Sequence, residues 1–81
     1  MMLRDAFPGD DLRVLYMRLV AYAARRVGAL EAEGVVQDSF LRTLNGSRRY
    51  KGRQPDSKEE WEALLFQTVR SVGSHRLRSR R

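Results

Sequence analysis

Residues 31–40, EAEGVVQDSF, place three carboxylates and an amide on one short segment of the chain. Paired carboxylates can act as a general acid and base or hold a Mg²⁺ ion. Glu33 and Asp38 are five residues apart, however, and on a helix they would point in different directions. His75 has no acid or nucleophile placed beside it by any motif, so we expect it at the surface or on a phosphate. We therefore expect neither an enzyme nor a metal site nor a cofactor.

Basic side chains form a second group, and their excess lies in the second half of the chain. Residues 1–47 hold six Arg against six acids, whereas residues 48–81 hold ten Lys or Arg against four acids and carry the whole net charge of +6. A one-ended positive field favours a polyanion, nucleic acid first, with an acidic protein or a membrane face as alternatives. The terminal arginines either form a solubilising tail or contact phosphate; they are Arg76, Arg78, Arg80 and Arg81.

The size and composition of the chain predict one small domain over residues 1–81. A domain of this length buries only about 60–70% of its unfolded surface, so its core must be economical. The chain has no Cys, which excludes disulfides, thiolate metal sites and a cysteine nucleophile and fits a reducing compartment. The segment MMLRDAFPGDD lacks the apolar run of a signal peptide, and no span reaches the roughly 20 apolar residues of a membrane helix. We expect a soluble, cytoplasmic protein.

Apolar residues at intervals of three and four predict a first helix over about 10–27. Phe7-Pro8-Gly9 is typical of a turn, and Asp10 or Asp11 can cap the helix that follows. Gly28 tolerates the backbone of a helix C-cap and ends it. The residues expected to face inward are Leu12, Leu15, Tyr16, Leu19, Val20, Ala23 and Val27.

A second helix is predicted over about 29–44, and the short joint at Gly28 favours an antiparallel hairpin. Its expected inward residues are Ala32, Val35, Val36, Phe40, Thr43 and Leu44. The remaining face gathers acidic, amide and apolar side chains into one expected exposed patch, made of Glu33, Gln37, Asp38 and Leu41.

The segment 45–56, NGSRRYKGRQPD, has no apolar periodicity and is predicted to be a basic loop. Tyr50 lies between two cations there, which suits stacking on a base as well as packing against a helix end. Ser57 and Glu60 form a capping-box pattern that opens a third helix over about 57–78. Gly73 weakens that helix, so we expect residues 74–81 to be less rigid.

The third helix completes a prediction of an all-α, compact three-helix domain without strands. Its expected inward residues are Trp61, Leu64, Leu65, Thr68, Val69 and Val72. Trp61 falls on this inward stripe, so we expect it in the core rather than against a base.

Two stretches resemble region 2 of bacterial sigma factors, particularly the extracytoplasmic-function group. Residues 32–42, AEGVVQDSFLR, are similar to that family's A-E-D-L-V-Q-E-T-F-L-R signature. Residues 65–78, LFQTVRSVGSHRLR, are similar to its L-F-x-I-A-R-N-L-A-x-D-x-x-R segment. The resemblance covers roughly residues 10–79 and implies a region-2-like fold and a role in transcription initiation.

The resemblance implies two partners, core RNA polymerase and promoter DNA. In the family the exposed face of the second helix docks on the Arg-rich clamp helices of the largest polymerase subunit, and Gln37 and Asp38 match the contact residues, with Glu33 and Leu41 beside them. The loop and third helix would open the minus-ten element and hold an unpaired base. The residues implied for DNA binding are Arg48, Arg49, Tyr50, Lys51, Arg53, Arg70, Ser71, Arg76 and Arg78.

Three positions depart from the family pattern. Gly34 stands where an acid is usual, Ser71 where Asn is usual and His75 where Asp is usual, near the surfaces for polymerase and base contact. The length leaves no room for the family's second DNA-binding domain, so the chain is either an excised domain or a lone region-2 protein. Two alternatives stay open: a sigma-like adaptor or decoy that binds an anti-sigma factor without reading promoters, and a generic basic helical nucleic-acid binder.

Overall fold

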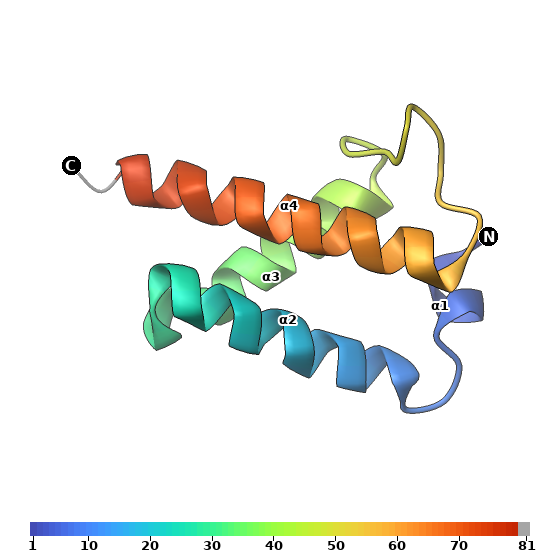
Figure 1. Ribbon diagram of the computed structural model, residues 1–81, viewed down its shortest axis with the longest axis horizontal. Coiled ribbons are helices and arrows are strands. Elements are labelled where there is room, and N and C mark those ends of the chain that lie inside the picture. The colour runs from blue at the N-terminus through green and yellow to red at the C-terminus, as the bar shows by residue number, and fades with distance from the viewer. Residues whose placement is uncertain (80–81) are drawn as a thin grey trace.

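The periodic apolar segments form helices in the computed structural model, which describes residues 1–79 (Figure 1). A short helix α1, Leu3–Ala6, is followed by α2, Asp11–Val27, α3, Ala29–Leu44, and α4, Lys58–Ser79. The three long helices pack against one another in every pairing. Among the described residues there is no strand, only one isolated bridge between Tyr50 and Arg53. The prediction of a compact all-α domain with three main helices is confirmed.

Gly28 separates α2 from α3 as predicted. Its φ of 91° is unfavourable for residues with a side chain, and its N–H donates to the Ala24 carbonyl at 2.9 Å to end α2. The chain then reverses, so that α3 runs back behind the other two long helices, α2 and α4 (Figure 1). The start of α2 agrees with the prediction, except for the expected capping hydrogen bond. Asp10 occupies the N-cap position, but its side chain makes no capping hydrogen bond there.

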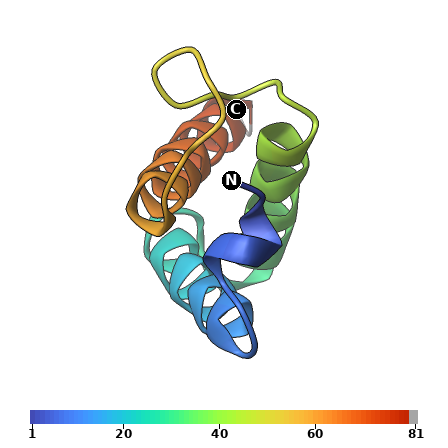
Figure 2. The same cartoon turned by 90° about the vertical axis from the view of Figure 1, so that its right-hand side faces the viewer.

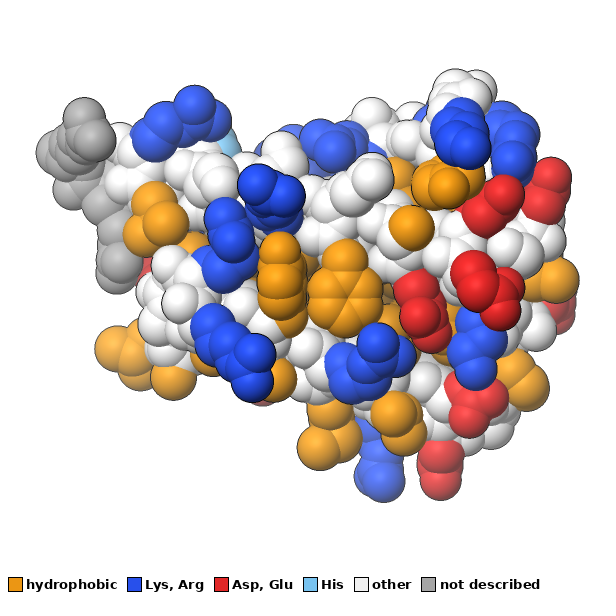
Figure 3. Space-filling view, viewed as in Figure 1, with side chains coloured by type: hydrophobic (Ala, Val, Ile, Leu, Met, Phe, Trp, Pro, Cys, Tyr) orange, Lys and Arg blue, Asp and Glu red, His pale blue; other side chains and the backbone are white. Residues whose placement is uncertain are grey.

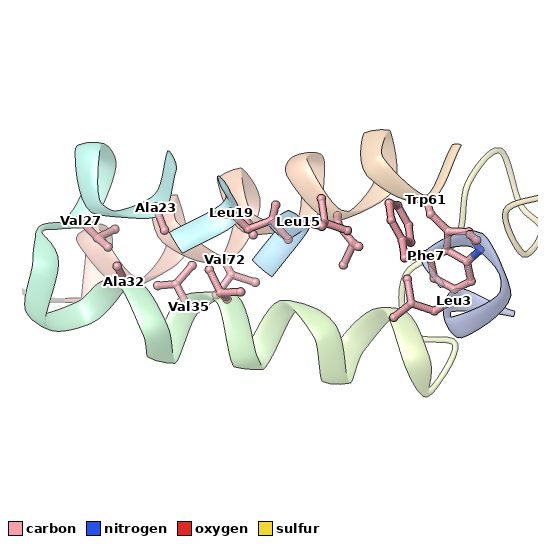
Figure 4. Packing of buried hydrophobic residues seen from close by; sticks show 14 residues of the cluster. Leu3, Phe7, Leu15, Leu19, Ala23, Val27, Ala32, Val35, Trp61 and Val72 are labelled. Carbon is pink, nitrogen blue, oxygen red and sulfur yellow. The ribbon is translucent and has the colours of Figure 1, made fainter. Parts of the chain in front are cut away.

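The core lies along the three-helix seam, and the expected apolar stripes supply most of it (Figure 4). Leu19, Val35 and Leu65 are fully buried, one from each long helix. Burying a side chain of this size contributes roughly 1.5–3 kcal/mol. Leu44 was expected inside but is 59% exposed, since it lies in the last turn of α3. Ser39, which was not expected inside, is buried with its hydroxyl donating to the Val35 carbonyl at 2.7 Å.

The N-terminal segment closes one end of the bundle, which the sequence did not predict. Leu3, Ala6 and Phe7 are buried, and Figure 4 shows Leu3 and Phe7 beside Trp61. Figure 2 shows α1 lying across that end of the long helices. The indole N–H of Trp61 donates to the Met1 carbonyl at 3.1 Å. Trp61 itself is 1% exposed, so its predicted place in the core is confirmed.

The helix α4 begins at the predicted capping box. The Glu60 N–H donates to the Ser57 hydroxyl at 3.2 Å, while the Glu60 carboxylate accepts from the Asp56 N–H at 2.9 Å rather than from Ser57. The helix then continues through Gly73 to Ser79, in agreement with the predicted helix over about 57–78.

Gly73 has a packing role that explains its place in a continuous helix. It is buried, and a Cβ added there would lie 3.3 Å from Cγ1 of Val27, so α2 and α4 approach closely at this point. The expectation for Arg80 and Arg81 falls outside the described residues. No helix within residues 1–79 is long and apolar enough to cross a membrane.

Candidate nucleic-acid interface and docking face

A polar cleft of about 250 Å³ separates α3 from α4, and we name it the α3–α4 cleft. Four of its side chains carry guanidinium groups: Arg42 from α3, Arg48 from the loop, and Arg76 and Arg78 from α4. The other lining residues are Asp38, Ser71, Val72 and His75. On α4, the spacing of 71, 75 and 78 by four and then three residues places these side chains on one helix face.

Hydrogen bonds hold the walls of this cleft together. The Arg48 guanidinium donates to the Ser71 hydroxyl at 3.4 Å, and the Arg48 N–H donates to the Arg42 carbonyl at 3.0 Å. Arg76 reaches across to α3, where it pairs with Glu31 at 3.4 Å and donates to the Gly34 carbonyl at 3.3 Å. Arg76 is therefore half-buried and joins two helices, so it is not a free surface cation.

A second group of predicted DNA-binding residues lies at the loop tip around Tyr50. The Lys51 ammonium and the Arg53 guanidinium lie 5.4 and 5.8 Å from the centre of the half-buried Tyr50 ring. The Arg53 guanidinium also donates to both oxygens of Glu60, at 2.8 and 2.9 Å. These bonds to Arg53, with that from the Asp56 N–H, lower the pKa of Glu60 from 4.5 to about 2.

Arg49 and Arg70, also predicted for DNA, lie outside both groups. Arg49 lines a separate pocket of about 260 Å³ at the end of α3, where its Nε–H donates to the Gly46 carbonyl at 3.4 Å. Arg70 is exposed on α4. The structure thus places four of the predicted DNA-binding residues in the α3–α4 cleft, namely Arg48, Ser71, Arg76 and Arg78, and the others outside it.

The predicted polymerase-binding patch is divided between two sides of α3. Gln37 and Leu41 line an open groove of about 640 Å³ between α2 and α3, which we name the α2–α3 groove. Glu33 is exposed one turn before Gln37. Asp38 instead lies in the α3–α4 cleft, with its side chain 32% exposed. Because one residue turns a helix by about 100°, adjacent positions face different neighbours, and the expectation of one exposed patch is wrong for Asp38.

The α2–α3 groove is largely apolar. Its remaining lining residues are Leu12, Arg13, Tyr16 and Phe40. The rings of Tyr16 and Phe40 are in contact, with 6.2 Å between their centres, and Leu41 beside them is 64% exposed. A contiguous apolar surface with a polar edge is typical of a protein-docking site.

The sequence analysis missed a third feature, which joins aromatic and basic side chains between α2 and α4. Tyr22 and Phe66 make an edge-to-face contact at 5.3 Å, with Arg18 5.5 Å from the Phe66 centre and Arg26 5.8 Å from the Tyr22 centre. Figure 3 shows this face, with basic side chains around hydrophobic ones and acidic side chains gathered toward the α1 end. The spacing of Tyr22 four residues from each arginine was the available signal.

Comparisons with models of protein families, with curated proteins and with solved structures found no match. The residues of the two surfaces define what each surface can bind. They offer guanidinium groups that can bind phosphate oxygens in the α3–α4 cleft, and an apolar surface for a protein in the α2–α3 groove.

Proposed function

We propose that the chain is a transcription initiation domain with a fold like region 2 of bacterial sigma factors. It binds core RNA polymerase through α3 and minus-ten promoter DNA through the loop and α4. The observation that carries this proposal is the difference between the two sides of α3. One side opens on the apolar α2–α3 groove and the other on the cationic α3–α4 cleft. A protein that bridges an enzyme and a nucleic acid needs two surfaces of this kind.

The DNA half of the proposal is supported by the types and positions of the basic side chains. Nucleic-acid affinity comes largely from cations that replace the counterions of phosphates, which guanidinium groups in the α3–α4 cleft can do. Opened bases are held by stacking on flat side chains, and Tyr50 offers a ring in a loop beside Lys51. Arg49 and Arg70 add further exposed positive charge.

The polymerase half is supported by exposure along α3. Glu33, Gln37 and Leu41 follow one another at four-residue intervals and are all exposed. An acid at one end of this row suits the Arg-rich clamp helices that the sequence resemblance implies as a partner. Gly34 lies instead toward α4, where the Arg76 guanidinium approaches it. The missing family acid at Gly34 therefore leaves the row through Gln37 intact.

The test is whether the chain retains core RNA polymerase during purification at moderate salt. The Glu33→Arg, Gln37→Ala double variant should lose that retention, because it removes the amide from the groove side and reverses the charge of the exposed acid one turn before it. Full retention by this folded variant would count decisively against the polymerase contact.

A sigma-like adaptor that binds an anti-sigma factor is the second candidate, and one observation favours it. Arg53 and Arg76, both implied for DNA, are already paired with Glu60 and Glu31 inside the domain. Binding to an anti-sigma factor without salt-sensitive DNA binding would select the adaptor. Equal affinity for duplex and single strand, with no polymerase retention, would instead select a generic nucleic-acid binder.

A further inference from the structure

The α3–α4 cleft contains one carboxylate among its four guanidinium groups. Asp38 accepts a hydrogen bond from the Arg42 Nε–H at 3.3 Å, and both side chains line the cleft. Both are also partly exposed, with 32% of the Asp38 and 49% of the Arg42 side chain accessible. An anion that enters the cleft therefore meets an arginine whose charge is already shared with a carboxylate.

The cleft suits a single phosphate group in size and in donors. Its volume of about 250 Å³ is below the usual range for drug-sized ligands, so a phosphate with a few waters fits it better than a whole nucleotide. Arg48 at present donates to the neutral hydroxyl of Ser71, and that hydroxyl can itself donate to a phosphate oxygen. Arg78 adds a further positive charge on the α4 wall.

We propose that the α3–α4 cleft binds one phosphate group, and that the Asp38 carboxylate competes with this phosphate for the Arg42 guanidinium. The Asp38 carboxylate therefore weakens the binding of anions in the cleft. The inference rests on the proposed function only for the source of the phosphate, which would be the backbone of an opened DNA strand. The competing source is a free phosphate compound, which shares the same chemistry.

The experiment measures the affinity of two probes, a fluorescent single-stranded oligonucleotide and inorganic pyrophosphate, for the purified chain at low salt. Asp38→Asn keeps the shape of the side chain and removes its charge. It should tighten binding by about two- to fivefold, the range expected for a partly exposed ion pair. Glu33→Gln is the matched control, because it removes one acid from the exposed surface of the same helix. It should change the affinity much less. If both variants tighten binding equally, the change in net charge alone explains the gain in affinity, and the inference is overturned.

Arginine variants locate the phosphate independently of Asp38. Arg78→Ala should weaken binding of both probes and lower the salt slope for the strand by about one. Arg25→Ala removes the same charge from the end of α2 and should leave the slope unchanged. Equal slopes for the two variants would place the phosphate elsewhere and overturn the inference.

The two probes separate this inference from the proposed function. If the strand does not bind but pyrophosphate binds and responds to Asp38→Asn, the cleft takes a free phosphate compound and the DNA role fails. If the strand binds but neither probe distinguishes Asp38→Asn from Glu33→Gln, the DNA role survives and the competition fails. Circular dichroism of each variant establishes that the helices are intact before affinities are compared.

Discussion

The Arg53 guanidinium donates two hydrogen bonds to the Glu60 carboxylate, at 2.8 and 2.9 Å, and so connects the loop tip to the first turn of α4. The same carboxylate accepts from the Asp56 N–H at 2.9 Å. Glu60 therefore organises the loop that carries Tyr50 and Lys51. Arg53, which the sequence resemblance implies for DNA binding, therefore also stabilises the loop.

The Arg53–Glu60 ion pair predicts how the stability of the fold changes as the pH falls. Because bonds to Arg53 and Asp56 lower the pKa of Glu60 from 4.5 to about 2, the native state holds the ionised form more tightly than the unfolded state does. The stabilisation is complete above pH 4.5 and is lost as the pH falls toward about 2. Thermal unfolding midpoints of the wild type and of Glu60→Gln should therefore differ at neutral pH and converge at low pH. Glu59→Gln is the control and should keep the wild-type acid dependence. A constant gap between wild type and Glu60→Gln would contradict the ion pair.

Truncation of the buried Trp61 side chain should cause the largest loss of stability. Its side chain is 1% exposed beneath the N-terminal segment, and truncation to Ala removes a large buried volume at a cost of about 3–5 kcal/mol. A small domain has little more than that in total, so Trp61→Ala should be largely unfolded at room temperature. Trp61→Phe keeps most of the volume but leaves the Met1 carbonyl without its donor, and it should cost about 1–3 kcal/mol. Urea unfolding followed by circular dichroism measures both. A wild-type midpoint for Trp61→Ala would show that the N-terminal segment does not seal this end of the core.

The parts of the fold that follow from local chemistry were predictable from the sequence. The long helices follow from apolar periodicity, and the start of α4 follows from the hydroxyl of Ser57 three residues before Glu60. The helix α1 was missed because its four residues are too few to show a period. Its burial depends instead on Trp61, sixty residues from Met1 in the chain.

The candidate site was only partly predictable, because its pairs join distant segments. The Arg48–Ser71 and Arg76–Gly34 contacts depend on how α4 crosses the rest of the fold, which no spacing in one helix records. Asp38 was assigned to the wrong side of α3 because its neighbour Gln37 was taken as sharing its face. Which residues of α3 line the groove and which line the cleft depends on where α2 and α4 pack against it.

The two helical glycines predict opposite responses to larger side chains. Replacing a helical Gly by Ala gains up to about 1 kcal/mol of helix propensity. At Gly34 the new Cβ would lie 2.9 Å from the Arg76 guanidinium, which is the movable end of a long side chain. That guanidinium would have to shift from its contacts with Glu31 and the Gly34 carbonyl, so Gly34→Ala should be stabilising by less than the full propensity gain. At Gly73 the neighbour is Val27, and a bulky residue has no room between α2 and α4. Gly73→Leu should cost about 1–3 kcal/mol by overpacking. Chemical denaturation of both variants checks the signs, and a stable Gly73→Leu would mean that α2 and α4 do not meet there.

The position of Leu41 indicates where a protein partner docks. It is 64% exposed at the edge of the α2–α3 groove, beside the contact of Tyr16 and Phe40. Leu41→Lys would place a cation in that apolar surface and against the Arg-rich partner proposed for it. Retention of core RNA polymerase should fall by about tenfold or more, as for a central interface residue. Leu30→Lys makes the same change at a leucine that is even more exposed but does not line the groove, so it should bind as the wild type does. Equal losses for the two variants would mean that added charge, and not the groove, governs docking. If neither variant loses retention, the partner must bind another face of the molecule, since both substitutions change the surface of α3 without disturbing the core.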